Sequence, residues 1–179
     1  MAFLKQWRSA FGQRLLLKKI QAHSKDKRSF DPSNIQRIVL VGSGSDTDQK
    51  SWEKAARSTF GKTVTLNWMW LCTNIKETQL IADEHVVLLS TKDFSFFYHP
   101  KMEVLEQLQR QQNQLLFGLD ENLDQCLLNL MTCAKGVFRV GKSNDHAHCC
   151  EFMLDMKDRS AKAKYLKEAL NYIKLMNPS

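Results

Sequence analysis

One short stretch constrains the fold of this chain more than any other: the apolar run Ile38-Val39-Leu40-Val41, which ends in Gly42-Ser43-Gly44-Ser45-Asp46. The run is too short for a helix and too apolar for an exposed strand, so it predicts a buried strand of a parallel sheet. Residues at helical spacing follow the glycines and predict a helix, namely Trp52, Ala55, Ala56 and Thr59. The stretch therefore predicts a strand, a tight turn and a helix.

The loop from Gly42 to Asp46 is the strongest ligand-site candidate in the sequence. Gly42 and Gly44 can adopt backbone angles closed to other residues, and the first turn of a following helix attracts anions and phosphates. The loop is neither a dinucleotide fingerprint nor a Walker loop. Two interpretations stay open: a phosphate site, or an ordinary turn with a capping side chain. The phosphate site would consist of Gly42, Ser43, Gly44, Ser45 and Asp46.

Strands and helices alternate along the rest of the chain. Apolar runs predict strands at 64–70, 85–89, 114–119, 137–140 and 150–156, and helical spacing predicts helices at 102–112, 123–134 and 160–176. The predicted fold is α/β, a Rossmann-like or flavodoxin-like doubly wound, mostly parallel sheet of five or six strands. Residues 35–179 form a single α/β domain, and residues 1–34 form a basic amphipathic helix and a linker.

The positive charge of the chain is concentrated at its N-terminus. Residues 1–30 hold eight lysines or arginines against one acid, whereas the rest of the chain holds 18 of each sign. The predicted helix at 2–22 could pack on the domain or on a second copy, lie on an anionic membrane surface, or contact RNA. A mitochondrial transit peptide is a further interpretation for a eukaryotic source.

Composition favours a cytoplasmic location. No apolar run approaches the length of a membrane span, and the N-terminus lacks a secretory signal. The five cysteines follow no disulfide framework, so we expect reduced thiols. The basic helix adds the hypothesis of peripheral attachment to the inner membrane.

An aromatic segment precedes Pro100 and cannot continue a strand. If the strands are parallel, this loop emerges at the same edge of the sheet as the glycine loop. We expect a pocket lining or a site for a protein partner. The residues concerned are Phe94, Phe96, Phe97, Tyr98 and His99.

Two further groups have the residue types of chemical sites. His146, His148 and Cys150 would share one face of an extended segment, but no fourth zinc ligand stands at a recognisable spacing. Polar residues at predicted strand ends suit acid-base or nucleophilic roles without forming a defined motif. These are Ser43, Ser45, Asp46, Asp48, His99, Asp120 and Asp145. The sequence assigns no catalytic residue and no cofactor.

Several short motifs carry resemblances. Gly42 to Asp46 resembles the phosphate-binding loop of the aminoimidazole ribonucleotide carboxylase family, although that family's His-Arg-Thr and Gly-Ala-Ala-His segments are absent. Residues 113–141 are similar to part of the acceptor domain of heptosyltransferase-type enzymes, but the chain is too short for their donor domain.

The overall pattern resembles an uncharacterised family of small Bacteroidetes α/β proteins. The resemblance rests on the basic N-terminal helix, the first strand, Lys92 to Lys101 and Ala134 to Gly141. It implies a bacterial cytoplasmic protein without an established activity, which disfavours the transit-peptide interpretation.

These observations lead to two functional hypotheses. The first is a non-catalytic binding or adaptor module with a small-anion site at 42–46 and a basic helix that docks on an anionic surface. The second is an enzyme acting on a phosphorylated sugar or nucleotide, with His99 or Asp120 in acid-base roles.

Overall fold

The structure is a computed structural model, and it contains one parallel sheet. It describes residues 31–32, 35–43, 49–72, 81–110, 114–120, 123–135, 137–142, 149–155 and 162–176, together with Ala10, Gly12, Arg14 and Lys18. Within these segments six strands run in the order β3-β2-β1-β4-β5-β6, and every neighbouring pair is parallel. They are β1 (Arg37–Ser43), β2 (Thr65–Leu71), β3 (Val86–Leu89), β4 (Leu115–Gly118), β5 (Phe138–Lys142) and β6 (Phe152–Leu154).

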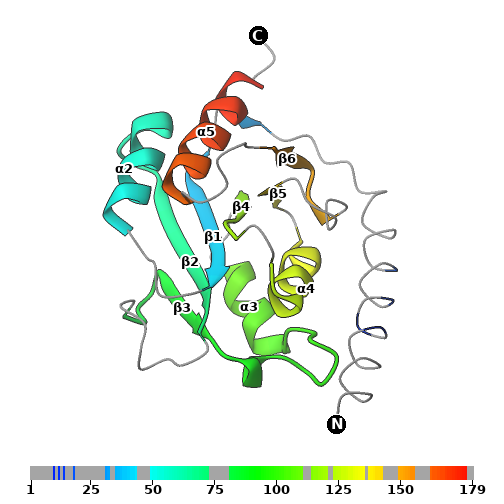
Figure 1. The fold of residues 1–179 in the computed structure, drawn as a ribbon. Coiled ribbons are helices and arrows are strands. Elements are labelled where there is room, and N and C mark those ends of the chain that lie inside the picture. The colour runs from blue at the N-terminus through cyan, green and yellow to red at the C-terminus, as the bar shows by residue number, and fades with distance from the viewer. Residues whose placement is uncertain are drawn as a thin grey trace.

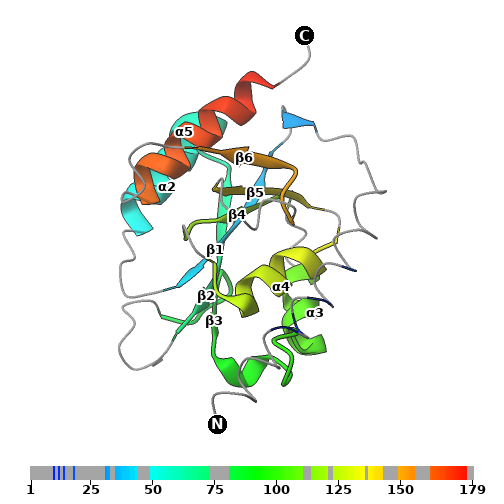
Figure 2. The ribbon, with the colours of Figure 1, turned by 45° about the vertical axis from the view of Figure 1, so that its right-hand side comes forward.

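Helices cover both faces of this sheet (Figure 1). On one face lie α2 (Gln49–Phe60) and α5 (Lys162–Leu175), and on the other lie α3 (Met102–Arg110) and α4 (Gln125–Cys133). Figure 2 shows α2 and α5 together on one side of the strands and α3 and α4 together on the other. The predicted doubly wound α/β fold is confirmed.

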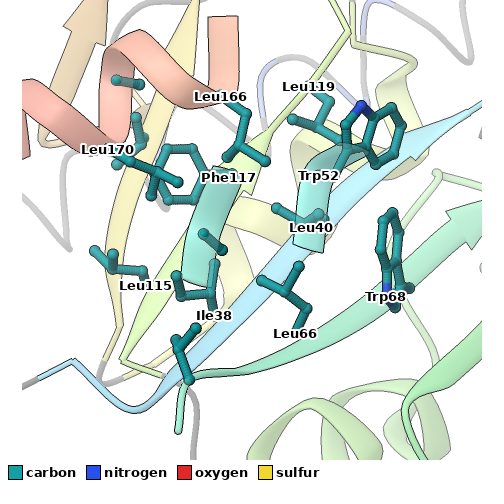
Figure 3. Packing of buried hydrophobic residues seen from close by; sticks show 14 of the residues in the cluster. Ile38, Leu40, Trp52, Leu66, Trp68, Leu115, Phe117, Leu119, Leu166 and Leu170 are labelled. Atoms are coloured by element: carbon teal, nitrogen blue, oxygen red, sulfur yellow. The ribbon is translucent and has the colours of Figure 1, made fainter. Parts of the chain in front are cut away.

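The core on the α2 and α5 side is built around three tryptophans. Trp52 of α2 stacks on Trp68 of β2 with ring centroids 5.1 Å apart, and Trp70 lies at 5.7 Å from Trp52. Figure 3 shows Leu166 and Leu170 of α5 beside Phe117 in the same layer. All three tryptophans are at most 2% exposed, so they are core residues and not the wall of an open ligand pocket.

The second face of β2 differs from its sequence pattern. Its alternation predicts one apolar and one more polar face, yet Asn67 is 3% exposed and Met69 is fully buried. A parallel sheet is covered by helices on both faces, so even the polar positions are enclosed. The Asn67 side-chain oxygen is 3.0 Å from Nδ1 of His85, which satisfies the buried amide.

Two local features refine the predicted elements. Gly61 ends α2 with φ of 96°, and its N–H donates to the Arg57 carbonyl, as its position after the helix predicts. The sixth strand is shorter than predicted, because pairing with β5 begins at Phe152 and leaves Cys150 before the strand.

The N-terminal residues are described only at four helical positions and at residues 31–32. Gly12 is buried, and a Cβ on it would lie 3.3 Å from the Phe97 carbonyl oxygen. The remaining residues of the predicted basic helix and linker lie outside the described residues. Among the described helices, none is long and apolar enough to cross a membrane.

Candidate functional site

The strand order reverses between β1 and β4. From β1 the chain continues outward through β2 and β3, and it then returns to the other side of β1 for β4, β5 and β6. Val41 of β1 is in register with Gly118 of β4, so Ser43, the last residue of β1, lies level with Asp120, two residues beyond the end of β4. Ligands of doubly wound proteins bind outside the carboxyl ends of the strands at such a reversal point.

Ser43, Asp120 and Lys162 form a hydrogen-bonded network at this edge. Ser43 Oγ donates to Asp120 Oδ2 at 2.8 Å, and Lys162 Nζ lies 2.7 Å from Asp120 Oδ1. Lys162 also donates to the Ser43 carbonyl oxygen at 2.9 Å. The network connects β1, the end of β4 and the first turn of α5, and we call it the switch-point network.

The switch-point network is largely shielded from solvent. The side chains of Lys162 and Asp120 are 18% and 12% exposed. The Lys162 ammonium also lies 4.9 Å from the centre of the Trp70 ring, a distance suited to a cation–π contact. These contacts offset the cost of removing the two charges from water, because desolvation disfavours the ionised form of a side chain.

Gly42 has a packing role next to this network. A Cβ on Gly42 would lie 2.6 Å from the Trp70 ring, closer than real atoms approach. Among described glycines only Gly61 has a positive φ, so Gly42 does not use the wider range of backbone angles open to a glycine. A glycine occurs here because the Trp70 ring occupies the space of a side chain.

The predicted loop residues are placed only in part. Gly42 and Ser43 belong to β1, and Asp120 adjoins Ser43, whereas Gly44, Ser45, Asp46, Asp48 and Asp145 lie outside the described residues. Sequence reasoning missed Lys162. Its signal was a lysine in the first turn of a helix, where the helix dipole disfavours a positive charge that has no other partner.

The aromatic segment begins at the carboxyl end of β3, but its residues divide between core and surface. Phe94 is 5% exposed and Phe96 is 55% exposed. Tyr98 has a φ of 62°, which is uncommon for a bulky residue and marks local strain. The turn is held by hydrogen bonds from Tyr98 N–H to the Ser95 carbonyl and from His99 N–H to Ser95 Oγ.

This turn presents His99 to Cys133, the last residue of α4. His99 Nδ1 is 3.0 Å from the Pro100 carbonyl oxygen, which only accepts, so Nδ1 carries the hydrogen. His99 Nε2 is then the acceptor that faces Cys133 Sγ at 3.8 Å. The sequence separation of 34 residues hid this thiol–imidazole contact from motif analysis.

The candidate metal ligands fall largely outside the described residues. His146 and His148 lie outside them, and Cys150 Sγ is 3.7 Å from Cys149 Sγ. Across the described residues no group of three or more histidine, cysteine or acidic side chains could hold a metal ion.

The two adjacent thiols differ in acidity. The hydrogen bond with Cys150 and the Arg139 charge lower the pKa of Cys149 despite its burial. The same hydrogen bond and burial raise the pKa of Cys150. The Arg139 guanidinium is bound by both oxygens of Glu151, and its own pKa is raised because this carboxylate outweighs desolvation.

Taken together, the strand order and the switch-point network define a doubly wound α/β protein with a polar centre at its topological reversal. A family model described as a family of unknown function (DUF6913) matches residues 8–176. The chain belongs to this family, which confirms the predicted membership of an uncharacterised family. No curated protein matches the sequence.

Proposed function

We propose that this chain is a binding module for a small phosphorylated metabolite, held outside the carboxyl ends of β1 and β4. The observation that carries the proposal is the switch-point network of Ser43, Asp120 and Lys162. Its three side chains come from segments far apart in sequence and meet where doubly wound folds bind ligands. A polar cluster at this position suits a ligand with both hydroxyl and phosphate groups.

The electrostatics of the helix ends favour an anion. The helices α2, α4 and α5 follow β1, β4 and β6, so each begins at this edge (Figure 1). The first turns of α2 and α5 contain no acidic residue, whereas Asp124 caps α4 and accepts from the Cys126 N–H. The positive ends of α2 and α5, with Lys162, would therefore attract a phosphate.

The contacts within the network favour binding over catalysis. One oxygen of Asp120 accepts from Ser43 Oγ and the other pairs with Lys162. A general base needs a lone pair directed at the substrate, and a serine nucleophile needs a base to take its proton. The enzymatic alternative with Asp120 as acid or base therefore requires a rearrangement that binding does not.

A thermal-shift titration of the full-length protein tests this proposal. Inorganic phosphate, nucleotides and sugar phosphates are added separately, and binding to the folded state raises Tm by mass action. We expect a stabilising ligand whose effect is lost in Lys162→Ala and retained in Lys167→Ala, an exposed lysine on the same helix. Equal shifts in both variants, or no shift with any ligand, would contradict the proposal.

A second role is favoured by the described part of the N-terminal helix. Gly12 is buried against the aromatic turn, while Arg14 and Lys18 are exposed. At 100° per residue, Arg14 and Lys18 lie on the side of the helix opposite Gly12. We propose that these basic side chains attach the domain to an anionic lipid surface.

Vesicle sedimentation tests the attachment. The full-length protein should bind phosphatidylcholine vesicles that contain phosphatidylserine, with a salt-sensitive affinity, and should not bind phosphatidylcholine alone. Replacing Arg14 and Lys18 by Glu should weaken binding about tenfold or more, given about 1 kcal/mol for each basic side chain. The same change at exposed Lys167 and Lys174 is the control. Retention on RNA without vesicle binding would overturn the lipid assignment.

A further inference from the structure

Cys149 and Cys150 form a sulfur pair outside the switch-point network. They lie before β6, separated from it by Glu151, and β6 pairs with β5 at the end of the described sheet. Their Sγ atoms are 3.7 Å apart, and none of the five cysteines takes part in a disulfide in the structure. A disulfide between consecutive residues closes an eight-membered ring, so joining these two thiols requires a twist of the peptide bond between them as well as rotation of the side chains.

The neighbouring strand accommodates this pair. A Cβ on Gly141 of β5 would lie 2.7 Å from Cys150 Sγ, so any larger residue would displace the thiol. The absence of a side chain at 141 thus places Cys150 Sγ against the backbone of β5. This glycine has a packing role, like Gly42 beneath Trp70.

A fixed positive charge lies close to both sulfurs. Arg139 is 9% exposed and acts electrostatically on Cys149 and Cys150. Two oxygens of Glu151 hold its guanidinium, with Nε at 3.1 Å from each, and a third contact joins Nη2 to Oε1. The Arg139 charge favours the thiolate of either cysteine, and the paired Glu151 carboxylate partly offsets this effect.

We propose that Cys149 and Cys150 are a redox-active dithiol that hydrogen peroxide converts into an intramolecular disulfide. The Cys149 sulfur attacks one peroxide oxygen, which breaks the O–O bond and forms a sulfenic acid, and the departing hydroxide takes up the thiol proton and becomes water. The Cys150 sulfur then attacks the Cys149 sulfur, displaces its hydroxyl group and loses its proton. Two thiols are oxidised and one peroxide is reduced, so the products are one disulfide and two water molecules.

Burial selects the class of oxidant. Cys149 is 4% exposed, so a small neutral oxidant reaches it more readily than a protein disulfide does. Cys133 provides the contrast within the same chain. It is partly exposed and contacts the His99 imidazole, so its oxidation would stop at a sulfenic acid or lead to a disulfide between two molecules.

The test uses the reduced full-length protein, equimolar hydrogen peroxide and subsequent alkylation, followed by intact mass and peptide mapping. We expect the intact protein to lose the mass of two hydrogen atoms. The single peptide that contains residues 149 and 150 should carry this loss and no alkyl group, and the other three cysteines should be alkylated. Cys133→Ser should give the same yield. Alkylated Cys149 and Cys150 beside an oxidised Cys133, or a disulfide between two molecules, would overturn the proposal.

Two variants separate the chemical step from folding. Cys150→Ser should accumulate a sulfenic acid at Cys149 that dimedone labels, and absence of this adduct in the folded variant would overturn the role of Cys149. Gly141→Ala keeps both thiols but crowds Cys150 Sγ. It should form the disulfide several-fold more slowly at unchanged circular dichroism, and an unchanged rate would show that the packing at Gly141 does not position the pair.

Discussion

The Nζ atom of Lys162 donates a 2.9 Å hydrogen bond to the carbonyl oxygen of Ser43, which lies 119 residues earlier in the chain. Through this bond and its ion pair with Asp120, the first turn of the last helix is connected to both strands at the reversal point of the sheet. The candidate ligand position therefore requires a residue from near the end of the sequence, which reaches it because α5 packs on the strands.

Replacing Lys162 by Met should destabilise the fold. The change leaves the Asp120 carboxylate largely buried without its cation, and we expect a loss of about 2 kcal/mol in the free energy of unfolding, below the 3–5 kcal/mol typical of fully buried pairs. Urea denaturation measures this loss. Lys167→Met, at an exposed position of α5, should change stability by less than about 0.5 kcal/mol.

The coupling of Lys162 to Asp120 can be measured with the double variant. Lys162→Met combined with Asp120→Asn should destabilise less than the sum of the two single changes, because each single change already removes the ion pair. Additive losses would show that the two charges do not interact in solution.

Gly42→Ala should destabilise the fold by about 1–3 kcal/mol, the usual effect of overpacking a core. The added Cβ would meet the Trp70 ring at 2.6 Å. Tryptophan fluorescence should change with it, because the ring must move. Gly61→Ala is the informative comparison: nothing lies within 4 Å of its Cβ, so its effect of about 1 kcal/mol comes only from the positive φ. A neutral Gly42→Ala would refute the packing role.

Tyr165→Phe should leave stability unchanged or increase it by up to about 1 kcal/mol at neutral pH. Tyr165 is 1% exposed, and among the described residues its hydroxyl oxygen is buried without a hydrogen-bond partner. Removing an unpaired buried hydroxyl removes its desolvation penalty. Tyr172→Phe, at a half-exposed position, is the matched control and should have no effect.

The same tyrosine gives a prediction for alkaline pH. Burial raises the pKa of Tyr165 above the ordinary value of 10.0, so the fold retains this proton after the unfolded chain has lost it. The unfolded state then binds fewer protons, and stability must fall as pH rises above about 10. Tyr165→Phe should reduce this fall. Equal alkaline slopes for both proteins in urea denaturation would contradict the assignment.

Cys133 should react faster with iodoacetamide in the unchanged protein than in the His99→Ala variant. The imidazole Nε2 faces the thiol at 3.8 Å and can accept its proton, and the thiolate is the reactive form. Peptide mapping after brief labelling should show a several-fold decrease at Cys133 in the variant. The labelling of Cys72, which is buried in the core on the α2 and α5 side of the sheet, is the reference.

The order of the elements was predictable because each has a local signature. The apolar run of β1 has a length and an apolar composition typical of a buried strand, and Gly61 ends α2 as a glycine after a helix should. Membership of an uncharacterised family was likewise predictable, from the basic N-terminal helix, the first strand and the segments 92–101 and 134–141. Gly42 shows the limit, because sequence alone suggested a special backbone angle where the structure has a tryptophan ring.

The sequence by itself determined the alternation of strands and helices, the burial of β1, and the concentration of positive charge before residue 31. Tertiary structure alone decided that Ser43, Asp120 and Lys162 meet, that His99 faces Cys133, and that Gly141 adjoins Cys150. The physical reason is range. Periodicity and capping act over a few residues, whereas these contacts depend on the strand order and register, which arise only when the sheet is packed between its helices.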